Sequence, residues 1–84
     1  MNCWLEVKDD KIIYYENGEQ GGCSRQFNLK GELHNTCGPA VVYGSYDDFQ
    51  VYEYWVNGEF VGKCTCMDKA EMDELEFKVM LYAE

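Results

Sequence analysis

Two Asn-Gly pairs, Asn17-Gly18 and Asn57-Gly58, constrain the fold of this chain more than any other feature. Asn-Gly is the strongest short-range signal for a β-hairpin, because a type I′ turn needs positive φ at both central residues. Each pair follows a run rich in aromatic and β-branched residues, 11–15 before the first and 49–56 before the second. Such residues pack well on a pleated sheet. The chain is therefore expected to contain antiparallel hairpins.

The two hairpin sequences also resemble each other, since YYENGE at 14–19 returns as YWVNGE at 54–59. Two copies are compatible with a duplicated β-unit. They are equally compatible with two unrelated hairpins that both use favourable turn residues. Further strands are expected at 3–7, 24–29, 40–43 and 59–64, and Gly21-Gly22 is expected to interrupt the pattern before the third strand.

The period of the apolar residues changes after residue 64. Met72, Leu75, Val79 and Tyr82 follow at spacings of three, four and three, which places them on one stripe of a helix, while Phe77 points away from it. Thr65 is the expected N-cap, with Asp68 three residues later as in a capping box. The predicted fold class is α+β, with an antiparallel β-meander of about five to six short strands and one C-terminal helix. A chain of 84 residues allows one domain, 1–84, with the meander over about 3–64 and the helix over about 67–82.

The central sequence resembles a MORN-like family of β-hairpin repeats found mostly in small bacteriophage and bacterial proteins. Leu33-His34 matches its first element, Gly38 to Val41 its Gly-Pro-Ala-apolar strand, and Trp55 to Gly58 its aromatic strand and Asn-Gly turn. Asn35, Thr36 and Cys37 replace the Arg and Asp that often follow the His. The resemblance covers about a third of the chain. It implies a hairpin fold and a phage or mobile-element origin, but no chemistry.

The charge of the chain excludes several classes of function. Sixteen acidic residues against seven Lys and Arg give a net charge of −9, whereas binding to nucleic-acid phosphates needs a basic patch. The same charge opposes anionic membranes, no window approaches the ~20 apolar residues of a membrane span, and the first residues lack a signal-peptide pattern. Five cysteines, an odd number without such a signal, are expected to be reduced thiols. We therefore expect a cytoplasmic protein that binds neither membrane nor nucleic acid directly.

Candidates for catalysis and metal binding are weak. His34 and Cys37 form the only local base and nucleophile pair, and no third group that would orient the base is apparent. We therefore expect no enzyme activity and no cofactor. A Cys3His zinc set of His34, Cys37, Cys64 and Cys66 is a disfavoured alternative, because only one residue separates Cys64 from Cys66, whereas zinc ligands usually have the spacing Cys-x2–4-Cys. Separate buried thiols are favoured over a zinc-stapled or thiol-reactive protein.

Surplus carboxylates are the most informative feature for function. Residues 66–84 contain six acids and two bases, and a field of this sign steers a protein towards cationic surfaces. Tyrosines are abundant as well, and tyrosine is common at binding hot spots. The alternatives are that the charge only keeps the chain dissolved and that the tyrosines only pair across strands.

We predict a small acidic non-enzymatic protein that binds the basic surface of a host protein or ribonucleoprotein. The resemblance to small phage proteins makes this prediction more specific: a phage-encoded inhibitor of a nucleic-acid-binding defence complex, an anti-CRISPR-like DNA mimic. A structural module that self-assembles through its β-hairpins is the alternative, and the oligomeric state stays open. The predicted contact residues are Asp47, Asp48, Glu53, Glu71, Asp73, Glu74 and Glu76, with Tyr46, Tyr52 and Tyr54 as aromatic anchors.

Overall fold

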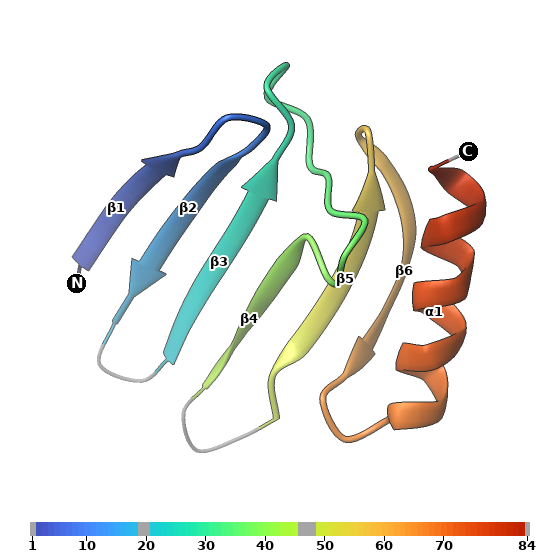
Figure 1. The fold of residues 1–84 in the computed structure, drawn as a ribbon. Helices are drawn as coiled ribbons and strands as arrows, with labels where there is room; N and C mark the ends of the chain where they lie inside the picture. Colours follow the sequence, from blue (N-terminus) through green and yellow to red (C-terminus); the bar gives the residue numbers. More distant parts are fainter. Residues whose placement is uncertain (1, 19–20, 46–48, 84) are drawn as a thin grey trace.

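A single antiparallel sheet with one helix on it forms the structure, a computed structural model that describes residues 2–18, 21–45 and 49–83 (Figure 1). The strands lie side by side in chain order, so the sheet is a meander. This confirms the predicted α+β fold class. The elements are β1 (Asn2–Val7), β2 (Ile12–Asn17), β3 (Gly21–Phe27), β4 (Val41–Ser45), β5 (Val51–Val56), β6 (Glu59–Thr65) and α1 (Lys69–Tyr82).

Only the second Asn-Gly pair forms the predicted tight turn. Asn57 and Gly58 have φ of 48° and 83°, and Val56 pairs with Glu59 across a two-residue loop. At the first pair, Asn17 still belongs to β2 and neither residue has positive φ. The Gly18 amide instead donates to the carbonyl of Gly21 over 2.8 Å, which continues the pairing of Asn17 with Gly22 by one step. In the first hairpin the Asn-Gly pair therefore still belongs to the paired strands, whereas in the second it forms the turn.

Gly21 and Gly22 begin β3, so the expected interruption at these glycines is wrong. Gly22 pairs directly with Asn17 of β2. A Cβ built on Gly22 would lie 2.6 Å from Asn17 Oδ1. Because Gly22 has no side chain, the side-chain amide of Asn17 can lie over the neighbouring strand. Glycine is therefore compatible with strand pairing at this position.

Helix α1 begins later than the sequence suggested. Asp68 is the N-cap, and its carboxylate accepts a hydrogen bond from the Glu71 amide over 3.1 Å. Thr65 is still the last residue of β6, where it pairs with Val51, so its prediction as N-cap is wrong. A capping carboxylate at this position accepts a hydrogen bond from a backbone N–H that has no partner within the helix. Its negative charge also interacts favourably with the positive end of the helix dipole.

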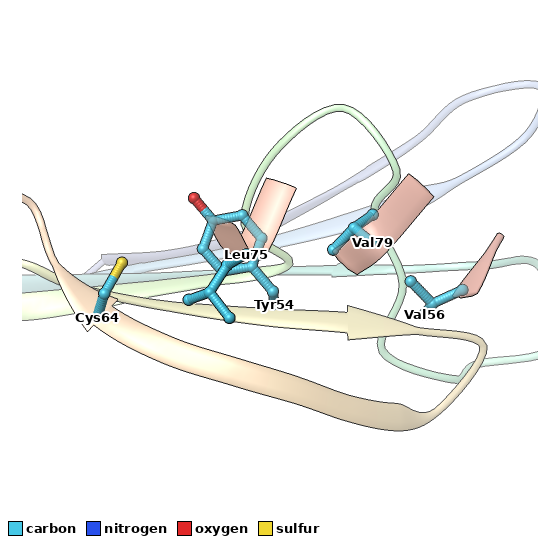
Figure 2. Close-up of a cluster of buried hydrophobic side chains, with 5 residues drawn as sticks. All are labelled: Tyr54, Val56, Cys64, Leu75 and Val79. Atoms are coloured by element: carbon cyan, nitrogen blue, oxygen red, sulfur yellow. The ribbon is translucent and has the colours of Figure 1, made fainter. Parts of the chain in front are cut away.

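The largest cluster of buried side chains lies between α1 and the last two strands. Tyr54 and Val56 of β5, Cys64 of β6, and Leu75 and Val79 of α1 are buried against one another (Figure 2). Met72 packs at the edge of this cluster, as the helical stripe predicted. The stripe ends sooner than expected, because Tyr82 is exposed.

The rest of the sheet has no helix over it. Among the described residues, α1 contacts only β5 and β6, and the molecule is thin, with extents of 38 × 31 × 16 Å. Residues paired directly across antiparallel strands point to the same face, so Tyr15, Ser24, Val42 and Tyr52 share the face that carries α1. Both faces of β1 are exposed along its whole length.

Candidate functional site

Helix α1 has apolar side chains on two opposite sides. Leu75 and Val79 point into the core, whereas Phe77, Met80 and Leu81 are exposed on the far side. Met80 and Leu81 follow Phe77 after three and four residues, so at 3.6 residues per turn the three side chains lie on one side of the helix. A helix that is apolar on both sides usually packs against something on both sides. The sheet covers only one of them.

Carboxylates surround the exposed apolar side chains. Asp73 lies one turn before Phe77, while Glu74 and Glu76 lie on opposite flanks of the same side, and all three residues are exposed. The Glu74 carboxylate is 3.5 Å from the Lys78 ammonium one turn later, an exposed pair of the kind that contributes little to stability. We call this set the outer face of α1, with members Asp73, Glu74, Glu76, Phe77, Met80 and Leu81.

Apolar residues inside a polar rim are the usual anatomy of a protein–protein interface. Burial of Phe77 and its neighbours would supply hydrophobic free energy, and the carboxylates would select a partner of opposite charge. Phe77 was absent from the predicted contacts. Its only signal in the sequence was that it fell off the core stripe of the helix.

Glu71 and Glu53 lie apart from the outer face of α1. Glu71 is half-buried, in the first turn and one turn before the buried Leu75. Glu53 points to the sheet face opposite α1, since it alternates with the core residue Tyr54. There it accepts a hydrogen bond from the Trp55 indole over 3.0 Å. The predicted carboxylates thus do not form one stripe.

Glu53 also acts on a tyrosine of the neighbouring strand. Burial and a hydrogen bond to Glu53 raise the pKa of Tyr43 in β4.

The predicted aromatic anchors are placed differently from the expectation. Tyr54 is 1% exposed and belongs to the core, so its prediction as a surface anchor is wrong. Tyr52 shares its face and packs against the same core. Tyr46, Asp47 and Asp48 lie outside the described residues.

The predicted zinc ligands do not converge. Cys64 is buried under α1, where burial raises the pKa of its thiol, whereas Cys37 is exposed in the loop between β3 and β4. His34 Nδ1 accepts a hydrogen bond from the Asn57 amide over 3.0 Å. Across the described ranges, no three His, Cys, Asp or Glu side chains are grouped so that they could hold a metal ion.

The segments that carry the MORN-like resemblance meet in the structure. The loop after β3 runs back between β3 and β5 to reach β4 (Figure 1). Besides the His34–Asn57 bond, the Gly58 amide donates to the Leu33 carbonyl over 2.9 Å and the Asn35 amide to the Trp55 carbonyl over 3.1 Å. Leu33-His34 is therefore joined to the Asn57-Gly58 turn. The role visible for these residues is to hold the loop against β5.

Comparison with family models, curated proteins and solved structures gives no match. Of the helices in the described part of the chain, none has the length and apolar character to cross a membrane.

One shallow hollow of about 230 Å³ lies on the face that carries α1, over β2 to β4. Its lining includes Tyr15, Asn17, Ser24 and Val42, and none of the described residues that line it carries a carboxylate or an imidazole. Cys23 also lines it, and burial raises the pKa of this thiol. A protonated thiol is a poor nucleophile.

Proposed function

We propose that this chain is a small non-enzymatic binding protein whose outer face of α1 docks on a basic, partly apolar surface of another protein or ribonucleoprotein. One observation carries the proposal: three apolar side chains, Phe77, Met80 and Leu81, are exposed together inside a rim of carboxylates. Phe77 is 60% exposed. An aromatic side chain in the middle of such a patch is the type of residue that carries binding energy.

Charge complementarity selects the partner. With a net charge of −9, the chain attracts cationic surfaces at long range and repels anionic ones. At short range Asp73 and Glu76 are available for Arg or Lys of the partner, while Glu74 can exchange its internal Lys78 for one. This exchange costs little free energy, because the Glu74–Lys78 pair is itself exposed to solvent.

A narrower form of the proposal names the partner class. Arg and Lys that normally hold phosphates would also accept carboxylates presented along a helix. Together with the resemblance to small phage proteins, this supports an inhibitor that occupies the nucleic-acid site of a host defence complex, as an anti-CRISPR protein does. Release of bound single-stranded DNA from a CRISPR effector complex on addition of the chain would test this form.

The general proposal is tested with a defined probe, an amphipathic helical peptide of Lys and Leu. Titration calorimetry at about 50 mM and about 500 mM NaCl separates the electrostatic from the hydrophobic contribution to binding. Screening at high salt removes most of the interaction between exposed charges. Asp73→Asn, Glu74→Gln and Glu76→Gln together are expected to weaken binding about tenfold or more at low salt and to flatten its salt dependence. Phe77→Ser is expected to weaken binding at both salt concentrations.

A matched control variant makes the same change in net charge at positions outside the outer face of α1. Glu6→Gln, Asp9→Asn and Asp10→Asn also remove three negative charges, all at exposed positions of β1 and the turn after it. Binding of the peptide to this control should stay within about twofold of the wild type. Equal weakening by both triple variants would show that only the net charge matters, and the outer face of α1 would then be the wrong site.

A further inference from the structure

We propose that the free edge of β1 is a second interaction surface, at which two copies of this chain pair β1 with β1 in an antiparallel, two-fold arrangement. The result is one sheet that runs through both copies, with the two α1 helices at its far ends. This inference concerns the edge opposite α1 and does not depend on the proposed function.

The structure leaves β1 ready for another strand. In the described residues only β2 pairs with it, over an unbroken register from Asn2–Asn17 to Val7–Ile12. Every residue of β1 is exposed. An edge strand presents unpaired N–H and C=O groups at every second residue, and these form a template for a further strand. Another extended strand can pair with this template.

The usual means of protecting an edge are absent from β1 and present at β6. The β1 sequence NCWLEV contains no proline, no glycine and no bulge, and its single charge is Glu6. At the other edge, the β5–β6 register shifts at Tyr54 and Trp55, Lys63 is exposed on β6, and α1 packs against the strand. Bulges, lysines and covering helices are the devices by which natural sheets prevent pairing of edges.

The side chains of β1 suit a symmetric pair. A two-fold axis perpendicular to the sheet keeps the α1 faces of both copies on one side, so directly paired residues must come from the same face. An axis through Trp4 pairs Asn2 with Glu6 of the second copy, and an axis through Leu5 pairs Trp4 with Glu6. Neither places Glu6 against Glu6. Trp4, already stacked on Tyr15 with ring centroids 4.9 Å apart, then adds apolar area on one face, and Leu5 and Val7 add it on the other.

The distribution of charge argues for a second copy at this edge. Each copy carries −9, so two copies repel, but α1, which contains Asp73, Glu74 and Glu76, lies at the side of the sheet far from β1 (Figure 1). Within β1 only Glu6 is charged, and its carboxylate lies 4.0 Å from the Lys8 ammonium. A basic partner would be drawn to α1, whereas β1 is the least charged edge at which two acidic copies can meet. Added salt should therefore strengthen this contact, whereas it weakens the contact proposed for α1.

Sedimentation equilibrium of the full chain tests the pairing at about 50 mM and about 500 mM NaCl. The wild type is expected to form a dimer that tightens at high salt. Leu5→Lys, at a side chain that is 58% exposed, should weaken the dimer about 100-fold or more, because either arrangement then loses two leucines and gains two lysines at or next to its axis. Leu29→Lys is the matched control, with the same substitution at 59% exposure in the β3–β4 loop, and should dimerise like the wild type.

Hydrogen exchange gives a readout that does not rely on a variant. Amides of β1 that point away from β2 should be protected at high chain concentration and exchange freely at low concentration, while amides of β5 should not change. A chain that stays monomeric at high concentration and high salt would overturn the inference, and so would a dimer that Leu5→Lys leaves intact. Either result would leave the proposal for the outer face of α1 standing.

Discussion

Gly62 of β6 lies directly under α1, and adding one methyl group there tests how the helix packs. A Cβ built on Gly62 would lie 2.4 Å from Leu75 Cδ2 and 3.6 Å from both Leu75 Cδ1 and Cγ. Leu75 is 2% exposed and held between β5, β6 and its own helix. Because neighbouring side chains enclose Leu75, Gly62→Ala is expected to push the helix away or to strain the leucine.

The expected cost follows from two opposing effects. Overpacking of a filled core costs about 1–3 kcal/mol, while replacing a strand glycine by alanine returns about 0.5–1 kcal/mol. Together the two ranges give a loss of about 0–2.5 kcal/mol of unfolding free energy, with about 1 kcal/mol near the middle. A domain of 84 residues has a total of only about 4–13 kcal/mol. A loss of about 1 kcal/mol is expected to lower the melting temperature by about 4–8 °C.

A double-mutant cycle identifies the contact. Leu75→Ala alone should cost about 2–5 kcal/mol through the cavity it leaves. In that background the Cβ of Gly62→Ala enters empty space, so the same substitution should become neutral or stabilising by up to about 1 kcal/mol. Urea unfolding measures all four free energies. Gly38→Ala is the control, since its Cβ would meet only Asn35 Nδ2 at 3.7 Å. An equal cost of Gly62→Ala in both backgrounds would refute the packing of α1 on β6 described above.

Three further outcomes are expected. Asn57→Ala should lower the unfolding free energy by about 1–2 kcal/mol, because alanine resists the positive φ of 48° that the turn requires; urea unfolding checks this, and Asn57→Gly should cost less. Burial, with Cys64 nearby, raises the pKa of Tyr54 from 10.0 to about 12, so the stability from this group is complete below about pH 10 and is lost as the pH rises to about 12. Tyr54→Phe should therefore make unfolding in urea less sensitive to alkaline pH, and an unchanged loss between about pH 9 and about pH 11 would contradict this. Iodoacetamide labelling followed by mass spectrometry should modify the exposed Cys3 and Cys37 first and the buried Cys64 only on unfolding.

The architecture was predictable because its signals are local. Alternation of apolar residues, turn residues and a change of period at residue 65 gave the strands, the helix and their order. The type I′ turn at Asn57-Gly58 followed from its two residues, but the same pair at residues 17–18 did not make it. There Asn17 remains paired with Gly22 in the sheet, so strand pairing overrode local turn preference.

The contact surface was less predictable, because burial depends on what lies across from a residue. Tyr54 alternates with Trp55 and is predicted to be a surface anchor, yet α1 packs over it. The helical stripe correctly assigned Leu75 and Val79 to the core and placed Phe77 on the other side. Nothing in the sequence showed that the sheet would be wider than its single helix, which is what leaves β1 uncovered on both faces.

The claim that the outer face of α1 binds a basic partner is tested most directly by NMR mapping. The isotope-labelled chain is titrated with the amphipathic Lys and Leu peptide at about 50 mM NaCl, and changes in amide chemical shift are followed along the chain. The largest changes are expected at Phe77, Met80, Leu81 and the acidic residues around them, whereas the amides of β1 to β3 should remain unchanged. Changes spread evenly over the acidic residues of the whole domain, or centred on β1 to β3, would show that the peptide does not bind at the outer face of α1.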